Sequence, residues 1–525
     1  MKLPIFLSLS LALLSPLVSA QEIKLLASDG AVDDSFGISC ALSDTTAIVG
    51  AYEGDGNVPD SGAAYLFDAT TGAELAKLTA SDGEFNDYFG QSVAISGDKV
   101  IVGASFNDDS GFSSGSAYLF DSTTGAQLAK LIASDGAGGD WFGWSVDISG
   151  DTAIIGAPHD DNIFPNCGSA YLFDTTTGAQ IAKLSASDRE PEDQFGISVA
   201  ISGNIAIIGA FGDDDLGNSA GSAYLFDITT GAELAKLTAS DGAAGDAFGQ
   251  EVDVSGTTAI VGAYPDDDNG TDSGSAYLFD TSTGAQIAKL TASDGASSDR
   301  FGFSVAISGT TAIVGAYRDG DNGPQSGSVY LYDTTTGAEL GKITASDGVS
   351  GDNFGSAVDF LGGTALVGAV NDDDNGNASG SAYLIDVCAG HVASYCVASP
   401  NSVSATGAPI SLDGLPSVSS NSMTLRADSL PPNQACLFFC GPIKQDPPVS
   451  FGDGLRCVGT SGLSRLNPPL MTGSGTAQRA LDLTSGPLSN TQVGDTQHFQ
   501  LWYRDPAAGG ATYNLSDALE ITFCP

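Results

Sequence analysis

Basic side chains are scarce in this chain of 525 residues, in which 18 lysines and arginines stand against 64 aspartates and glutamates. The formal net charge at pH 7 is −46. Nucleic acids and anionic membranes attract positively charged protein surfaces, so this composition argues against both as partners. Cations and basic protein surfaces are the partners that the charge favours.

Histidine is also rare in this sequence. The three histidines, His159, His391 and His498, show no spacing typical of a metal site or of a nucleophile with its base. Carboxylates are so numerous that a pair of them carries no information about a glycosidase site. The sequence therefore predicts a protein that is not an enzyme.

A long apolar run occurs only at the start, where residues 1–20 read MKLPIFLSLSLALLSPLVSA. The early lysine, the apolar stretch and the small residues at its end are typical of a secretory signal peptide cleaved after Ala20. No later segment is long and apolar enough to cross a bilayer. We expect a secreted protein, extracellular or at the cell surface, with no transmembrane segment.

Repetition dominates the sequence that follows. Phe-Gly pairs recur every 53 residues, from Phe36-Gly37 to Phe354-Gly355, and a Gly-Ala pair follows each phenylalanine by 14 residues. Each of the seven units holds four short apolar runs, such as SVAISG, TAIVGA, SAYLFD and AELAKL, bounded by turn-forming residues. Four strands in each of seven units predict an all-β fold, a seven-bladed β-propeller over residues 21–387.

The two ends of the repeat array complement each other. The array opens with EIKLLASDG, which matches the fourth strand of a unit, and ends with SAYLID at 381–386, where a fourth strand is missing. An open array would need a distinct cap at each end. We therefore expect the strand near Ile23 to Ala27 to pair with the last unit and close the ring.

The Phe-Gly and Gly-Ala pairs, with Gly156-Ala157-Pro158 complete, resemble FG-GAP repeats, the units of the seven-bladed propeller of integrin alpha chains. The resemblance implies an extracellular protein engaged in protein binding or cell adhesion. Integrin-type repeats often hold calcium in an Asp-rich loop between the FG and GAP elements. Here that interval, for example Ile197 to Ile208, contains only two strands and a turn, so neither the calcium ligands of the family nor integrin-like ligand binding can be carried over directly.

Acidic loops follow the Gly-Ala pairs instead. Carboxylates alternating along a Gly-containing loop suit Ca²⁺, which takes roughly 6–8 oxygen ligands, and DDDNGTD at 266–272 is the best single candidate. The alternative is that Asp, Asn and Gly form solvated turns without metal. The candidate Ca²⁺ ligands in these loops are Asp213, Asp215, Asp266, Asp268, Asp272, Asp319, Asp321, Asp372 and Asp374.

A second set of acids recurs as Ser-Asp-Gly followed by an aspartate just before each Phe-Gly pair, as in Asp241 with Asp246 and Asp294 with Asp299. Aspartate side chains accept hydrogen bonds from nearby backbone amides in turns. We expect this set to have a structural role in the connection between blades.

Two tryptophans depart from the repeat. Trp141 and Trp144 flank the Phe-Gly pair in DWFGWS. Tryptophan is enriched at binding hot spots, so both are candidates for contact with a sugar or a protein partner. Packing within one blade is the alternative.

Residues 388–525 lose the period and hold six of the eight cysteines. Runs such as ACLFFCG and HFQLWYRDP predict a small β-sandwich-like domain. This region resembles a Cys-containing module at the C-terminal ends of secreted bacterial proteins. Export favours disulfide bonds, although six cysteines allow 15 pairings. Cys40, which stands where the next unit has Val93, is expected to be a buried, unpaired thiol.

These features predict a secreted, non-catalytic binding or scaffold protein. Its propeller would present acidic loops to an extracellular protein or glycan, with Ca²⁺ stiffening those loops. The alternative is an extracellular enzyme, a hydrolase or lyase acting on polysaccharide, that uses the propeller face. Nonrepeating polar residues at the central channel would favour the enzyme.

Overall fold

A computed structural model describes residues 21–387 without interruption. Beyond them it describes 392–396, 404, 408–413, 423–451, 454–458, 460–461, 463–466, 470–472, 475–483, 486–489, 491, 496–505 and 513–522. The predicted signal peptide, residues 1–20, lies outside the described residues.

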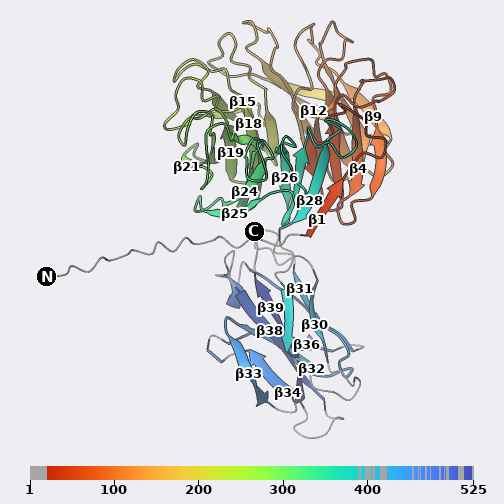
Figure 1. Cartoon of the computed structure of the whole chain (residues 1–525), viewed down its shortest axis with the longest axis vertical. Helices are drawn as coiled ribbons and strands as arrows, with labels where there is room; N and C mark the ends of the chain where they lie inside the picture. Colours follow the sequence, from red (N-terminus) through yellow and green to blue (C-terminus); the bar gives the residue numbers. More distant parts are fainter. Residues whose placement is uncertain are drawn as a thin grey trace, which may run out of the picture.

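Residues 21–387 form seven four-stranded antiparallel sheets set as blades around a central axis (Figure 1). The first strands of neighbouring blades contact one another around this axis. The second strand of each blade, such as β11 (Thr152–Ala157), is buried along nearly its whole length, as expected for a strand covered on both faces. The predicted seven-bladed β-propeller is confirmed.

Six blades follow the chain in order. Blades one to three consist of β2 (Cys40–Leu42), β3 (Thr46–Ala51), β4 (Ala63–Asp68) and β5 (Glu74–Leu78); β6 (Phe89–Ser96), β7 (Lys99–Ala104), β8 (Ser116–Asp121) and β9 (Gln127–Leu131); β10 (Val146–Ser149), β11, β12 (Ser169–Asp174) and β13 (Ala179–Leu184). Blades four to six consist of β14 (Val199–Ser202), β15 (Ile205–Ala210), β16 (Ser222–Asp227) and β17 (Ala232–Leu237); β18 (Glu251–Ser255), β19 (Thr258–Ala263), β20 (Ser275–Asp280) and β21 (Gln286–Leu290); β22 (Phe301–Ser308), β23 (Thr311–Ala316), β24 (Ser328–Asp333) and β25 (Glu339–Ile343).

The seventh blade is built from both ends of the array. Its strands are β26 (Phe354–Leu361), β27 (Thr364–Ala369), β28 (Ser381–Asp386) and β1 (Gln21–Leu25). Strand β1 pairs antiparallel with β28, with Gln21 opposite Asp386 and Leu25 opposite Ala382. The predicted closure of the ring by the N-terminal strand is therefore confirmed, and it covers the edge that β28 would otherwise expose.

The Phe-Gly and Gly-Ala pairs recur because they meet where neighbouring blades touch. A Cβ added at Gly156 would lie 2.0 Å from the carbonyl oxygen of Gly196 in the next blade. Gly196 itself has a φ of +94°, which favours glycine. The buried ring of Phe195 packs edge-on against Tyr224 and Phe226, with ring centroids 5.5 and 5.8 Å apart. Each pair thus supplies close backbone contact together with an aromatic filling.

A second group of strands follows the propeller. One sheet contains β29 (Val392–Cys396), β39 (Tyr513–Thr522), β38 (Thr496–Arg504), β32 (Ala435–Gly441), β35 (Ser464–Arg465) and β36 (Leu470–Met471). Another contains β30 (Ile410–Asp413), β31 (Thr424–Ala427) and β37 (Ala477–Ala480), while β33 (Lys444–Phe451) pairs with β34 (Gly454–Val458). Residues of both sheets, among them Leu425, Phe438 and Leu501, share one apolar core. The predicted C-terminal β domain is present.

Helix is nearly absent from the described chain. One short 3₁₀ helix, η1 (Gly486–Leu488), occurs among the described residues. Within the described part of the chain, no helix has the length and apolar character needed to cross a membrane.

The cysteines differ in state. Cys40, Cys167, Cys436 and Cys440 carry free thiols, whereas Cys457 is disulfide-bonded. Cys40 is unpaired as expected, but it is only partly buried because it lines the central channel rather than the interior of a blade. Cys388, Cys524 and the side chain of Cys396 lie outside the described residues, so the pairing scheme stays a prediction.

Candidate functional site

A lysine on the outer strand of each blade lies beside a tyrosine of the preceding strand. In the fourth blade, Lys236 on β17 and Tyr224 on β16 are direct antiparallel partners, so their side chains share one face of the sheet. The Lys236 ammonium lies 5.4 Å from the centre of the Tyr224 ring. Both side chains reach Asp213, which begins the acidic loop after β15.

Three carboxylates surround the Lys236 ammonium. Its Nζ lies 2.8 Å from Asp188 and 2.7 Å from both Asp213 and Asp215. The Tyr224 hydroxyl donates to Asp188 at 3.0 Å and to Asp213 at 2.8 Å. Asp213 is buried, whereas the side chains of Asp188 and Asp215 are 42% and 64% exposed. We call this set of lysine, tyrosine and surrounding acids the lysine cluster of a blade.

The contacts of the lysine cluster favour the charged forms of Lys236 and Asp188. Burial alone would lower the pKa of Lys236, but its hydrogen bonds to Asp188, Asp213 and Asp215 outweigh burial and raise this pKa above its ordinary value. Burial likewise opposes the charged form of Asp188, yet the hydrogen bonds from Lys236 and Tyr224 hold the pKa of Asp188 below its usual value. The cluster is therefore a set of ion pairs at neutral pH.

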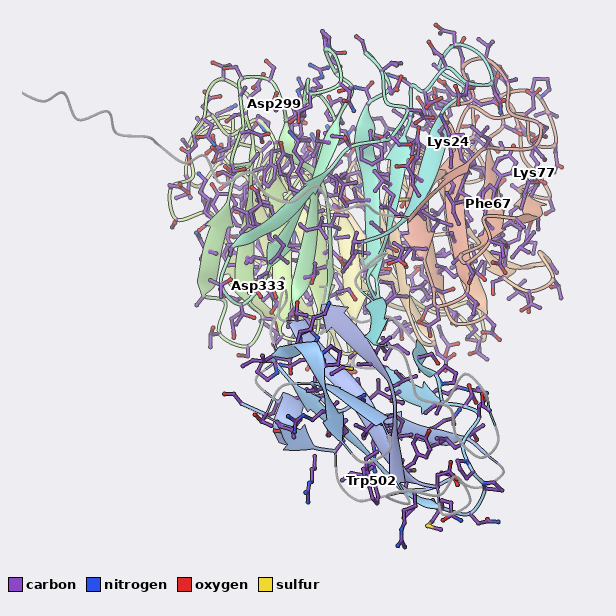
Figure 2. All side chains as sticks on the ribbon, turned by 60° about the horizontal axis from the view of Figure 1, so that its bottom comes forward. Lys24, Phe67, Lys77, Asp299, Asp333 and Trp502 are labelled. Atoms are coloured by element: carbon purple, nitrogen blue, oxygen red, sulfur yellow. The ribbon has the colours of Figure 1, made fainter. Side chains whose placement is uncertain are left out.

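All seven blades have a lysine cluster. Three more blades offer three carboxylates each: Lys289 contacts Asp241, Asp266 and Asp268, Lys342 contacts Asp294, Asp319 and Asp321, and Lys24 contacts Asp347, Asp372 and Asp374. The other blades offer fewer: Lys183 contacts Asp135 and Asp160, Lys130 contacts Asp82 and Asp109, and Lys77 contacts Asp29 and the carbonyl oxygen of Asp55. Figure 2 labels Lys24 and Lys77, which belong to adjacent blades.

Eight of the nine aspartates predicted to bind calcium belong to lysine clusters. Asp213 and Asp215 come together with Asp188, and Asp319 and Asp321 with Asp294, each set having carboxylate oxygens within 4.8 Å of one another. Asp266, Asp268, Asp372 and Asp374 surround the ammonium groups of their own blades in the same way. Asp272 is the exception. It lies at a turn with a φ of +53°, and its backbone N–H donates to Asp267 at 2.8 Å.

The sequence alone did not assign the lysines to a site. It also did not assign the aspartates in the connections between blades, such as Asp188. A signal for the lysines was present. Seven of the 18 basic residues recur at the same repeat position, on the outer strand: Lys24, Lys77, Lys130, Lys183, Lys236, Lys289 and Lys342. In so acidic a chain, that recurrence indicates a fixed partner for each lysine.

The three carboxylates around Lys236 do not suit a calcium ion while the lysine ammonium lies among them. The Lys236 ammonium carries three N–H groups, and three carboxylates accept from them. A calcium ion among the same oxygens would lie against a positive charge in partly buried surroundings, where like charges repel strongly. The calcium prediction therefore requires that the lysine leave its position.

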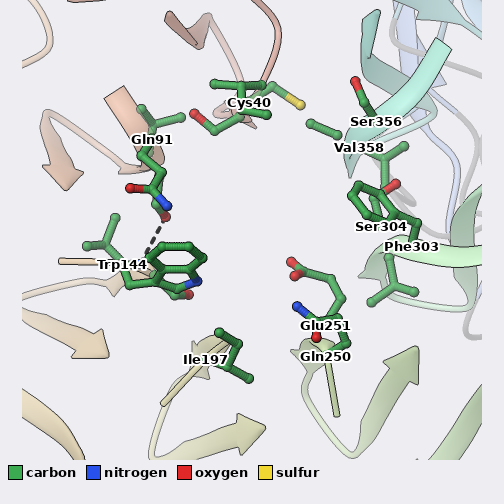
Figure 3. Close-up of a pocket in the computed structure, with 18 of the residues that line it drawn as sticks. Cys40, Gln91, Trp144, Ile197, Gln250, Glu251, Phe303, Ser304, Ser356 and Val358 are labelled. Atoms are coloured by element: carbon green, nitrogen blue, oxygen red, sulfur yellow. Dashed lines mark hydrogen bonds between the residues drawn. The ribbon is translucent and has the colours of Figure 1, made fainter. Parts of the chain in front are cut away.

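A second candidate site lies at the central channel. A cavity of about 300 Å³ is lined by residues that follow the Phe-Gly pairs of all seven blades. In Figure 3, Trp144 and Phe303 lie on opposite sides of this cavity, and the carboxylate of Glu251 reaches into the space between them. The amides of Gln91 and Gln250 also line it. The cavity therefore combines aromatic walls with a few polar groups, as small ligand sites do.

The first residue after each Phe-Gly pair does not follow the repeat and is one of five residue types. We call the seven residues at this position the channel mouth: Ile38, Gln91, Trp144, Ile197, Gln250, Phe303 and Ser356. The next position is a serine in five blades but Glu251 in the fifth blade and Ala357 in the seventh. Burial raises the pKa of Glu251 to about 8, against the effect of a hydrogen bond with Ser198. Departures from the repeat thus gather at the channel.

Aromatic rings continue outward from Trp144. Trp141 stacks on Trp144 with centroids 5.1 Å apart and on His159 with centroids 3.6 Å apart. Phe106 lies 5.2 Å from Trp141, and Tyr88 lies 4.8 Å from Phe106. Of the two tryptophans proposed for ligand contact, Trp144 lines the cavity, whereas Trp141 packs against the rings of Phe106, Trp144 and His159.

A second aromatic group adjoins Phe303 and carries positive charge. Phe303 packs against Tyr264 and Tyr317, with centroids 5.4 and 4.3 Å away. The Arg300 guanidinium donates to the Tyr317 hydroxyl at 3.0 Å and lies 5.2 Å from the centre of the Tyr264 ring. Arg318 lies 5.3 Å from the centre of the Tyr317 ring. Two arginines are thereby held near the channel of an otherwise acidic propeller.

Three further acids depart from the repeat on the inner strands. Asp147, Asp253 and Asp359 stand where the other four blades have alanine. Each accepts a backbone N–H from the next blade, at 2.7 Å from Ile201 for Asp147 and at 2.7 Å from Ile307 for Asp253. These carboxylates therefore join neighbouring blades.

The FG-GAP repeat family matches the chain in seven segments. They are residues 20–67, 73–120, 126–173, 179–226, 232–279, 285–332 and 338–385. No curated protein shows a significant sequence match to the chain. The matched segments cover more than half of the chain, and each contains the outer strand of one blade and the first three strands of the next, so the chain belongs to the FG-GAP repeat family.

Proposed function

We propose that this chain is a secreted, non-catalytic binding protein whose ligand face is the channel mouth and the aromatic groups around it. The observation that carries the proposal is the contrast between repeat positions. The strand sequences are nearly identical in every blade, as in SAYLFD, whereas the seven channel-mouth positions hold five different residue types. Repeat proteins keep a common scaffold and vary the positions that meet a partner.

Packing alone does not account for this variation. Two positions further along the inner strand, six of the blades have valine, as at Val93, and only Cys40 differs. Five of these valines also line the cavity, so lining the channel does not by itself make a repeat position vary. The mixture of Trp144, Phe303, Gln91 and Gln250 instead gives one asymmetric surface with apolar walls and amide groups, which suits a protein loop or a glycan.

The acidic loops contribute less to this face than their composition suggests. Carboxylates of these loops, such as the buried Asp213 and the exposed Asp215, are already engaged by lysine. We therefore place the ligand at the channel mouth. The excess negative charge of the chain remains a long-range attraction for basic partners.

The test is a binding screen of the full secreted chain against extracellular proteins and glycans. For each ligand found, Trp144→Ala and Gln250→Ala should weaken binding by about tenfold or more, as loss of a contact at a binding hot spot does. Phe112→Ala is the matched control, because Phe112 is 81% exposed and lies outside the channel. A ligand that binds equally well to the Trp144 variant, and weakly to the Phe112 variant, would contradict the proposal.

A second candidate function is that of a polysaccharide hydrolase or lyase, and Glu251 is the observation that favours it. Glu251 replaces a repeated serine, and a pKa of about 8 keeps its carboxyl protonated at neutral pH, as a general acid requires. Product formation from a polysaccharide panel, lost in Glu251→Gln, would support this candidate. Binding without turnover, retained in the same variant, would support the non-catalytic function.

A further inference from the structure

We propose that, in the four blades whose loops the sequence predicts to bind calcium, a lysine ammonium occupies the place of the cation, and that these four places become calcium sites when the lysine is removed. The native propeller then needs no divalent cation. This inference concerns the loops of the blades and is independent of the ligand at the channel mouth.

In the fourth blade, the surroundings of the Lys236 ammonium resemble those of a bound cation. The ammonium of Lys236 is held at 2.7–2.8 Å by three carboxylates from two separate segments, the connection before the blade and the loop after β15. Its side chain is only 20% exposed. The lysine thus does what a bound cation does in an acidic loop, because it neutralises the buried carboxylate of Asp213 and joins the two segments.

Across the seven blades, the lysine position is more constant than the first position of the acidic loop. The lysine is present in all seven blades, whereas the first loop position changes from Gly54 through Asn107 to aspartate in the other five. A calcium loop would keep its acids and let the neighbouring strand vary. Here the ammonium and the aspartate of the blade connection are constant while the loop acids vary, so the loops are arranged around lysine.

The four clusters with three carboxylates differ from the others in what remains without lysine. Removing the ammonium of Lys236 leaves three carboxylates with oxygens within 4.8 Å of one another, one of them buried and without a cation. Together with the Tyr224 hydroxyl and water, they supply the oxygen ligands that Ca²⁺ takes. In the first blade, removal of Lys77 leaves the single carboxylate of Asp29 and the Asp55 carbonyl oxygen.

The experiment compares Lys236→Met with Lys77→Met in the full chain. Melting temperatures are measured in CaCl₂, in MgCl₂ and in NaCl at matched ionic strength, because any cation relieves some repulsion at a charge of −46. We expect the wild type to respond equally to calcium and magnesium. Lys236→Met should melt several degrees lower without calcium and recover selectively with it, whereas Lys77→Met should melt lower with no calcium-selective recovery.

Terbium luminescence gives a direct readout of the same sites, because Tb³⁺ occupies calcium sites and is excited through a nearby tyrosine, here Tyr224. Signal that appears in Lys236→Met and is displaced by calcium supports the proposal. Calcium-selective stabilisation of the wild type that Asp213→Asn removes would overturn it. So would a folded Lys236→Met protein with no calcium preference. Lys236→Gln, which keeps an N–H donor for the carboxylates, replaces Lys236→Met where the latter yields no folded protein.

Discussion

At Gly156 the backbone of one blade comes so close to that of the next that a methyl group has no room. The same approach recurs at Gly103 and Gly209, where an added Cβ would lie 2.0 and 1.9 Å from a carbonyl oxygen of the following blade. Such a contact with backbone cannot be relieved by turning a side chain. The Gly-Ala pairs are therefore a requirement of blade packing.

We predict that Gly156→Ala lowers the free energy of unfolding by roughly 1–3 kcal/mol or more, since it overpacks a contact between two backbones. Urea or thermal unfolding measures the change. Gly341→Ala is the matched control, because no atom lies within 4 Å of its added Cβ and the equivalent residue in the first blade is Ala76. The control should be neutral or stabilising by up to about 1 kcal/mol. Equal stability of both variants would contradict this account of the motif.

Individual site residues were harder to predict than the motif. Trp144 was identified because it departs from the repeat, and the structure places it at the channel. Lys236 was not, because a lysine on an outer strand normally points into solvent, and its partner Asp188 is 48 residues away. Only the return of the chain from one blade to the next brings such residues together, and the loop composition alone therefore suggested a metal.

At the scale of elements, β1 is the strand that closes the ring of blades. It is the outer strand of the seventh blade although it precedes the first blade in the chain. Lys24 on β1 supplies the ammonium of the lysine cluster in that blade, and its Nζ lies 2.8 Å from both Asp347 and Asp372. The pairing of β1 with β28 and this cluster together hold the two ends of the ring.

We predict that deletion of Glu22 to Ala27 destabilises the whole propeller by more than about 4 kcal/mol. Burial of Leu25 alone is worth ~2 kcal/mol, and the deletion also exposes the edge of β28 and leaves Asp372 without its ammonium. Differential scanning calorimetry checks the result. Leu75→Ser, a change at a 54% exposed residue of an outer strand, should leave the melting temperature nearly unchanged. An unchanged melting temperature in the deletion variant would show that the ring closes without β1.

The strands of the propeller could be predicted almost completely, because the pattern of each strand recurs seven times at a spacing of 53 residues. The missing fourth strand after Asp386 and the extra strand near Ile23 were sufficient to predict the closure. The C-terminal region has no period, so its strands could be assigned only as short apolar runs. Its sheet order, with β32 beside β38 and β39 beside β29, depends on contacts distant in the sequence that no local pattern shows.

At the scale of the whole molecule, the acids fall into two populations with opposite responses to pH. Hydrogen bonds from lysine and tyrosine hold the pKa of Asp188, Asp241 and Asp294 below its usual value, although burial opposes them. Burial instead raises the pKa of Asp140 to about 6 and that of Asp147 to about 7. The first population stabilises the fold when charged, and the second when protonated.

These shifts predict a maximum of stability in mild acid. A carboxyl whose pKa is raised in the folded state binds its proton more tightly there, so its contribution is full below the unfolded value and is lost as the pH rises through the folded value. For Asp147 that loss falls between about pH 4 and pH 7. The lysine-cluster acids act in the opposite sense, because their contribution is lost only as the pH falls below about 4. The free energy of unfolding should therefore peak near about pH 4–5 and decline toward pH 8.

Asp147→Ala isolates one member of the second population. Alanine occupies the same position at Ala94 and Ala200, so the fold accommodates it. We expect this variant to lose about 2–3 kcal/mol of the decline between pH 5 and pH 8, because position 147 then develops no charge as the pH rises, whereas Asp253 and Asp359 still do. Asp214→Ala, a change in an exposed part of an acidic loop, serves as the control and should keep the wild-type slope. Denaturant unfolding at fixed ionic strength across this range measures both slopes. If stability instead rose steadily up to pH 8, or if Asp147→Ala kept the full decline, the inner-strand carboxyls would not be the groups that set the pH response of the propeller.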